Sequence, residues 1–200
     1  MLQLALASQS PRRRELLTSA GFEFHLFPVK VSEIFDENLT GEAVVSQLAT
    51  LKGLAAIDQY NQLKSPGFLV LSADTIVILE GHVLGKPENS QQAAEFLRRL
   101  SGKTHSVMSG VHLRESGSTK VWTGFSETKV EFRILSAQEI DTYVASGEPM
   151  DKAGAYAIQG EAGKFVSSYL GSWSNVVGLP MELFEEALEK NGWNVARRSP

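Results

Sequence analysis

Four clusters of residues in this chain have types and spacings suited to chemistry on a charged ligand. The first, Ser8–Arg14, follows an apolar run and opens a predicted helix, with Ser10 typical of an N-cap and Pro11 of a first helical residue. Loop amides, a helix N-terminus and adjacent guanidinium groups make an anion site suited to phosphate. The alternative is a solvated basic helix start without a ligand. Basic residues there oppose the helix dipole, however, so they need some other reason.

The second cluster is centred on Asp74, between two strongly apolar segments. Residues 68–71 and 75–79 each read as a buried strand, and we expect the polar interruption at 72–74 to separate them. We expect an acid in that position to be partly desolvated, which raises its pKa and suits it to general-base or metal work. The alternative is an aspartate that only caps a turn. Lys86 follows soon after and can bring an ammonium group into the same region.

The third and fourth clusters are rich in glycine and other small residues. Residues 147–160 interleave carboxylates, Lys152 and Gln159 with glycines that let the backbone approach a ligand closely, although a glycine-rich surface loop has the same composition. Residues 171–180 form a small-residue turn before a helix, which alone indicates only structure. The histidines lack metal-ligand spacing, and no Walker or GxGxxG sequence is present. What remains is anhydride or ester chemistry run by carboxylates and basic residues, with or without a divalent ion.

Composition narrows the class of protein further. The 200 residues include 19 Lys and Arg against 23 Asp and Glu, and the net charge of -4 argues against binding to a nucleic acid duplex. Hydrophobic residues make up 42%, which excludes a largely disordered chain, and the absence of cysteine excludes disulfides and thiolate chemistry. No apolar stretch approaches the roughly 20 residues that cross a membrane, and the first apolar run has its charges on the wrong side for a secretory signal. We therefore expect a cytoplasmic protein without a membrane partner.

The elements that must position these clusters alternate between strands and helices, which indicates the α/β class. Further strands are expected at residues 2–7, 104–113 and 119–134. Further helices are expected after Thr40, from a cap at Ser90, after a capping box of Ser136 with Glu139, and from Pro180. In the helix after Thr40 the expected apolar face is Val44, Val45, Leu48, Leu51 and Ala55. We expect one domain over residues 1–200, within which a smaller lobe at about 90–150 has no marked edges.

Taken together, the clusters resemble the Maf family of nucleoside triphosphate pyrophosphatases, also called septum-formation inhibitor proteins. The matching pieces occur in family order: LASQSPRR at 6–13, SADTIV at 72–77, GKP at 85–87, the segment 148–160, and SNVVGLP at 174–180. The resemblance implies a mixed sheet with flanking helices and two lobes around a central cleft, similar to inosine triphosphate pyrophosphatases. It also implies hydrolysis of a nucleoside triphosphate to the monophosphate and pyrophosphate, a divalent cation such as Mg²⁺ or Mn²⁺, and a homodimer.

The resemblance also assigns residues. Asp74 matches the proposed general base, and Glu33 or Asp74 are the candidate metal ligands. The residues that match polar groups of the family's cleft are Ser8, Arg12, Arg13, Glu33, Lys52, Lys86 and Gln159, with Lys152 in a matching Asp-Lys-Ala-Gly stretch. Arg12, Thr75 and Gln159 resemble the subgroup that acts on dTTP and UTP. Two alternatives stay open: a pyrophosphatase for 7-methyl-GTP or another modified purine, and a nucleotide-binding regulator of septum formation with little turnover.

Overall fold

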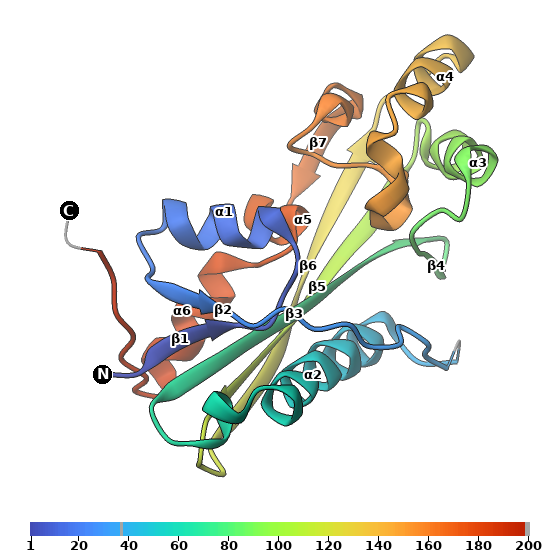
Figure 1. Ribbon diagram of the computed structural model, residues 1–200. Helices are drawn as coiled ribbons and strands as arrows, with labels where there is room; N and C mark the ends of the chain where they lie inside the picture. The colour runs from blue at the N-terminus through green and yellow to red at the C-terminus, as the bar shows by residue number, and fades with distance from the viewer. Residues whose placement is uncertain (37, 199–200) are drawn as a thin grey trace.

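The computed structural model describes residues 1–36 and 38–198, which form one mixed sheet with flanking helices, as the sequence predicts (Figure 1). In the described chain the strand order is β2-β1-β3-β5-β6-β7, and β4 pairs with β3 off this path. Pairing is parallel among β2, β1 and β3 and antiparallel elsewhere. The strands are β1 (Gln3–Leu6), β2 (Phe24–Leu26), β3 (Phe68–Leu79), β4 (His82–Leu84), β5 (Thr104–Glu115), β6 (Val121–Phe132) and β7 (Val166–Leu170).

The helices gather in two groups at the two ends of the long strands β3, β5 and β6 (Figure 1). One group is α1 (Pro11–Ser19), α2 (Gly41–Gln59), η1 (Asn61–Lys64), α5 (Trp173–Val177) and α6 (Met181–Lys190). The other is α3 (Ser90–Leu100), α4 (Ala137–Ala145), η2 (Glu148–Asp151), η3 (Ala153–Ala155) and η4 (Glu161–Phe165). Because three strands continue through both groups, we propose that the chain is one domain, with the lobe at about 90–150 as part of it.

The apolar core is divided at the middle of the same strands. The cluster beside α6 includes β3 residues up to Ala73 and β5 residues from Val111, whereas the cluster beside α3 and α4 begins at Val77 and includes Val107. The residues between them along β3 and β5 include Asp74, Thr75 and Ser109, and all three make side-chain hydrogen bonds. A polar layer therefore crosses the sheet between two apolar clusters.

The prediction of two strands separated at residues 72–74 is wrong, because β3 runs unbroken from Phe68 to Leu79. The polar side chains that suggested a break are satisfied where they lie. Ser72 Oγ donates to Ala49 O at 2.7 Å, and Asp74 pairs with Lys52. A buried polar group with a partner costs little, so the strand can carry both groups through the core.

Helix α2 packs closely on the sheet through a buried row in which alanine and glycine are frequent. The buried row runs through Val45, Ala49, Gly53 and Ala56. Val44, Val45 and Leu48 are buried as predicted, but Leu51 is 39% exposed, because it lies off this row. The prediction of Ser90 as the cap of α3 is wrong by one residue: Ser90 is the first residue of the helix, and the cap is Asn89, whose Oδ1 accepts from Gln92 N at 2.9 Å.

Two other helix signals agree with the structure, while Pro180 is the residue before α6 and not its first residue. Ser136 and Glu139 form the predicted capping box of α4. Gly21 ends α1 with a φ of 77°, a conformation in which a side chain would be strained. Nowhere in residues 1–36 and 38–198 does a helix combine the length and apolar character needed to cross a bilayer.

Candidate active site

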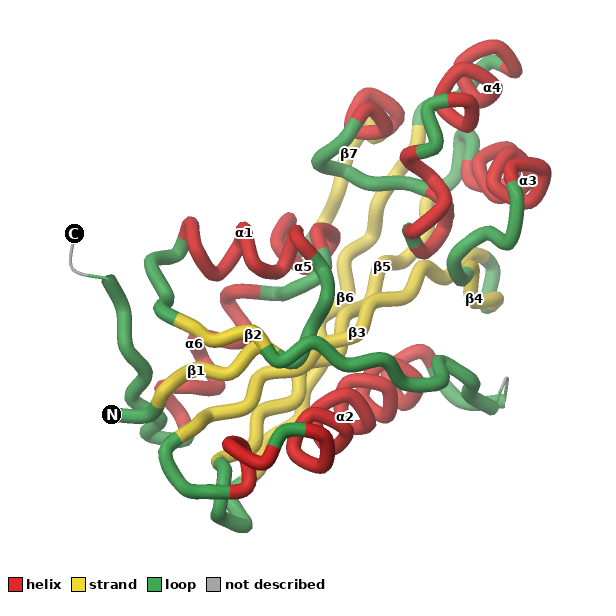
Figure 2. Tube along the Cα trace, viewed as in Figure 1, coloured by secondary structure: helices red, strands yellow, loops and turns green. Residues whose placement is uncertain are grey.

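A cleft of about 880 Å³ opens along the edge of β3. β1 pairs with β3 only as far as Leu71, and β4 pairs with it only from Val77, so neither covers the stretch 72–76. The loop that follows β1 and the loop 29–35 that follows β2 border this gap, as the loop segments in Figure 2 show. All the predicted site residues line the cleft: Ser8, Arg12, Arg13, Glu33, Lys52, Asp74, Thr75, Lys86, Lys152 and Gln159.

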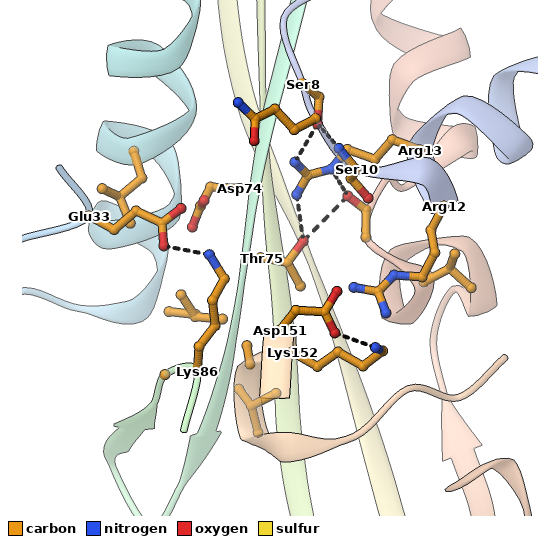
Figure 3. A pocket seen from close by; sticks show the side chains of 18 of the residues that line it. Ser8, Ser10, Arg12, Arg13, Glu33, Asp74, Thr75, Lys86, Asp151 and Lys152 are labelled. Atoms are coloured by element: carbon orange, nitrogen blue, oxygen red, sulfur yellow. Dashed lines mark hydrogen bonds and ion pairs between the residues drawn. The ribbon is translucent and has the colours of Figure 1, made fainter. Parts of the chain in front are cut away.

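Asp74 and Thr75 are neighbours on a strand, so their side chains point to opposite sides of the sheet. Asp74 faces α2, where Lys52 Nζ donates to its Oδ1. Thr75 faces α1 and α5, where its Oγ1 accepts from Arg13 Nη2 at 3.2 Å (Figure 3). The open edge of β3 gives a ligand in the cleft access to both sides. Two chemically different clusters therefore meet in one cavity.

On the α2 side, acids and lysines alternate in a chain of ion pairs. Lys52 Nζ contacts both Asp74 and Glu33, at 2.8 Å from Glu33 Oε1, and Lys86 Nζ lies 2.9 Å from Glu33 Oε2. The Lys52 and Asp74 side chains are 13% and 8% exposed, so their pairing is screened little by solvent. Glu33 and Lys86, in contrast, lie on the open rim. The burial expected for Asp74 is confirmed; its pairing with Lys52 was not predicted.

The pKa of Glu33 is set by competing effects. Partial burial raises the pKa of this carboxyl, but the hydrogen bonds and positive charges of Lys52 and Lys86 outweigh burial and lower the pKa to about 2. Glu33 is thus an anion throughout the physiological pH range. It holds two ammonium groups at the mouth of the cleft.

On the other side, Arg13 is fixed by three side-chain donations. Its Nε donates to Gly178 O at 2.8 Å, its Nη1 to Ser8 Oγ at 3.2 Å and its Nη2 to Thr75 Oγ1. Burial lowers the pKa of Arg13, and the charge of Asp74 opposes that shift, but a guanidinium remains charged in either case. The three contacts leave one N–H on each terminal nitrogen to face a ligand. The three acceptors explain why an arginine is present near this helix N-terminus, where the helix dipole alone disfavours it.

Further polar groups lie along the rim near η2 and η3. Lys152 Nζ donates to Glu148 O at 2.7 Å and pairs with Asp151 at 2.5 Å. Arg12 Nε is buried and has no hydrogen-bond partner among the described residues. A charged donor that the fold leaves unpaired is an indication of an anionic ligand. Gln159 is exposed on the loop that follows η3.

The sequence did not identify two parts of this site. Gly178 and Asn175 contribute backbone carbonyls from a segment that alone indicated only structure, and Ser109 supports Thr75 from β5. Backbone carbonyls leave no signature in residue type. Ser109 had no clear signal either, because β5 contains several other polar residues.

Comparison with known proteins finds a family and similar proteins that cover nearly the whole chain. Residues 3–191 match the family described as Maf-like protein. A dTTP/UTP pyrophosphatase of Bdellovibrio bacteriovorus is 48% identical, over 94% of this chain and 97% of that protein. Others with the same name are 46% identical in Photorhabdus laumondii, over 95% and 94% of the two chains, and 42% identical in Pelotomaculum thermopropionicum, over 98% and 100%. The solved structure of the Staphylococcus aureus Ham1 protein matches with a TM-score of 0.40 at 12% identity, over 65% of this chain and 71% of that one.

Proposed function

The chain belongs to the Maf-like protein family, and we propose that its cleft carries out the reaction of a dTTP/UTP pyrophosphatase. In that reaction water attacks the α-phosphorus of a nucleoside triphosphate, which yields the monophosphate and pyrophosphate. The observation that carries the proposal is the meeting, in one cleft, of a buried carboxylate paired with lysine and an oriented guanidinium.

The cationic side of the cleft suits a triphosphate, which carries about four negative charges near neutral pH. Arg13 offers an N–H on each terminal nitrogen, a geometry that matches two oxygens of one phosphate group. Arg12 offers its Nε, which has no partner in residues 1–36 and 38–198, and Lys86 and Lys152 border the same space. Donors fixed before the substrate arrives stabilise charge that develops in the transition state without reorganisation.

Asp74 is the general base of the proposed mechanism. Lys52 holds its Oδ1, and the other carboxylate oxygen is then available to accept a proton from water. As the water oxygen bonds to the α-phosphorus, its proton passes to Asp74, and the bond from that phosphorus to the bridging oxygen breaks. Pyrophosphate leaves with the bonding electrons, and its negative charge faces the arginines and lysines.

A divalent cation, Mg²⁺ or Mn²⁺, is part of this proposal, and the donor set fits one. No group of three or more Asp, Glu or His side chains that could hold a metal occurs in the described part of the chain. Two carboxylates, Asp74 and Glu33, do contact the same ammonium group of Lys52, so they lie near each other. Mg²⁺ is commonly held by one or two carboxylates together with substrate phosphates. When bound, the cation would supply Lewis-acid polarisation of a phosphoryl oxygen.

Selection of the base is assigned to Gln159 together with Arg12. An amide has both a donor and an acceptor, so Gln159 can complement the O4 acceptor and the N3–H donor of uracil or thymine. Its place on the exposed loop beside the cleft leaves the amide accessible to a base. A homodimer and a cytoplasmic location belong to the proposal as well, with family resemblance as their support.

The test is a nucleotide panel on the purified chain with detection of pyrophosphate. We expect release from dTTP and UTP in the presence of Mg²⁺ or Mn²⁺, less from CTP and purine triphosphates, and little in EDTA. Asp74→Asn keeps the size of the side chain but removes the base, so turnover should fall about 100-fold or more. Release of orthophosphate, or activity on 7-methyl-GTP above that on dTTP, would contradict the proposal. Near-normal turnover in a folded Asp74→Asn protein would move the base elsewhere, with Glu33→Gln as the next variant.

A further inference from the structure

A line of buried hydroxyl groups leads from Arg13 away from the cleft. Arg13 Nη2 donates to Thr75 Oγ1 at 3.2 Å, Thr75 Oγ1 lies 2.8 Å from Ser109 Oγ, and Ser109 Oγ donates to Asn175 O at 3.0 Å. Ser109 is fully buried and lies outside the lining of the cleft, so it has no contact with a substrate there. The line joins α1, β3, β5 and α5.

The two ends of this line determine which way each hydrogen points. A guanidinium can only donate and a carbonyl oxygen can only accept. Ser109 donates its one hydroxyl hydrogen to Asn175 O, so Thr75 must be the donor in the contact between the two hydroxyls. Thr75 Oγ1 then turns its lone pairs to Arg13. All donations therefore run in one direction, from Arg13 to α5.

The competing arrangement leaves an acceptor unpaired. Thr75 Oγ1 also lies 3.3 Å from Gly178 O, but that carbonyl already accepts from Arg13 Nε at 2.8 Å. If Thr75 donated there and Ser109 donated to Thr75, Asn175 O would lose its donor within the core. An unmet buried acceptor carries the full cost of its desolvation.

The far end of the line is itself rigid. Asn175 is fully buried, and its Nδ2 donates to Val107 O and to Thr128 Oγ1, both at 2.9 Å. α5 is thus fixed to β5 and β6 at the residue whose carbonyl receives the hydrogen of Ser109. The contacts of Ser109 and Asn175 therefore hold Thr75 Oγ1 in a fixed position relative to the sheet.

We infer that Ser109 is a positioning residue that acts through Thr75 to orient Arg13 for phosphate. The inference rests on the proposed function for the role of Arg13. The hydrogen of the Thr75 hydroxyl is directed at Ser109, so a lone pair of Thr75 Oγ1 faces the Arg13 guanidinium. Loss of the Ser109 hydroxyl therefore weakens the hold of Arg13 on phosphate equally for every nucleotide.

The test compares Ser109→Ala and Thr75→Val with a matched control, Ser116→Ala. Ser116 is also a buried serine, in the turn that follows β5, and its Oγ accepts from Phe68 N at 2.9 Å, but it does not line the cleft. We expect kcat/KM to fall about 10-fold in the first two variants and to hold in the control, although all three lose some stability. In Ser109→Ala the ratio of kcat/KM for dTTP and CTP should stay within about twofold of the wild-type ratio.

Two further readouts separate positioning from a general loss of packing. Ser109→Ala should add less than about twofold to the loss in a Thr75→Val background, because both act through one contact. Thr75→Ser, which restores the oxygen, should recover most of the activity that Thr75→Val loses. Additive losses in the double variant would overturn the inference, and so would a changed base preference or unaltered kinetics in Ser109→Ala.

A binding measurement keeps this test independent of turnover. Inorganic pyrophosphate, titrated by calorimetry, should bind the wild-type protein and Ser116→Ala alike and bind Ser109→Ala about 10-fold more weakly. Weakened binding in a protein that hydrolyses no nucleotide would refute the proposed function and retain the positioning of Arg13. Equal binding by all three proteins would refute the positioning.

Discussion

Gly110 of β5 lies against the backbone of α2, and its substitution tests how the ion pair of Lys52 and Asp74 is placed. A Cβ atom added to Gly110 would lie 2.3 Å from Val45 O and 2.5 Å from Val45 C. These are backbone atoms of α2, so no rotation of a side chain can relieve the overlap. The change Gly110→Ala therefore forces the helix away from β5.

The size of the effect follows from the contact distance. Ordinary van der Waals contact requires about 3.4 Å, so α2 must move outward by about 1 Å. Lys52 lies two turns along the same helix from Val45, and its ammonium would move away from Asp74 by a similar distance. Overpacking of this kind costs about 1–3 kcal/mol in the free energy of unfolding. A 1 Å displacement of a group at the reaction centre lowers kcat/KM by up to about 100-fold.

The assay combines urea unfolding with steady-state release of pyrophosphate from dTTP. Gly124→Ala is the matched control, because the three atoms nearest to its added Cβ all belong to the Trp122 side chain, at 2.6 Å and beyond. We expect the control to lose stability and keep kcat/KM, whereas Gly110→Ala loses both. Wild-type kcat/KM in folded Gly110→Ala protein would show that the approach of α2 to β5 does not set the position of Lys52.

Three other predictions follow from the same structure. Gln159→Glu should weaken transition-state binding of dTTP and UTP by about 1–3 kcal/mol, measured as a fall in kcat/KM, because the carboxylate repels O4 of the base. An equal fall on CTP and 7-methyl-GTP would refute base reading. Lys86→Ala should lower kcat/KM about 10-fold on all nucleotides alike, since phosphate contacts do not read the base, and a changed preference would place Lys86 in the base pocket. Burial lowers the pKa values of His105 and His112 to about 4, so the folded state disfavours their protonation. The free energy of unfolding should be at its full value above pH 6.5 and fall by about 3 kcal/mol per histidine as the pH drops to 4. His112→Gln should remove the part of this pH dependence that His112 causes. A free energy of unfolding by urea that stays constant from pH 7 to 4.5 would contradict this.

Local patterns predicted the elements well where a chemical rule acts over a few residues. The capping box at Ser136 and the helix end at Gly21 are decided by neighbours in the chain. The break expected at residues 72–74 failed because the partners of Ser72 and Asp74 come from α2, 23 and 22 residues away. Without those partners, polar side chains do interrupt a buried strand.

In the candidate site, too, residue types could be predicted from the sequence, whereas contacts between distant segments could not. Asp74, Arg13 and Lys86 were identifiable as residues suited to chemistry, and the structure does bring them to one cleft. The contacts that orient them were not, because Gly178 contributes only a carbonyl and α2 is placed by the absence of a side chain at Gly110. Such contributions depend on tertiary packing, and a single sequence does not specify it.

The alternation of Asp74 and Thr75 across β3 restricts how this protein can change in length. Their side chains serve opposite sides of the sheet, and β3 pairs with β5 continuously from Leu69 to Ile78. Deletion of one residue within that stretch would reverse the facing of every side chain beyond it and exchange the places of the two. Insertions and deletions that survive selection should therefore fall outside it, for example in the exposed turn between β5 and β6. In evolutionary terms β3 is a segment of fixed length, even where its individual apolar residues are free to vary.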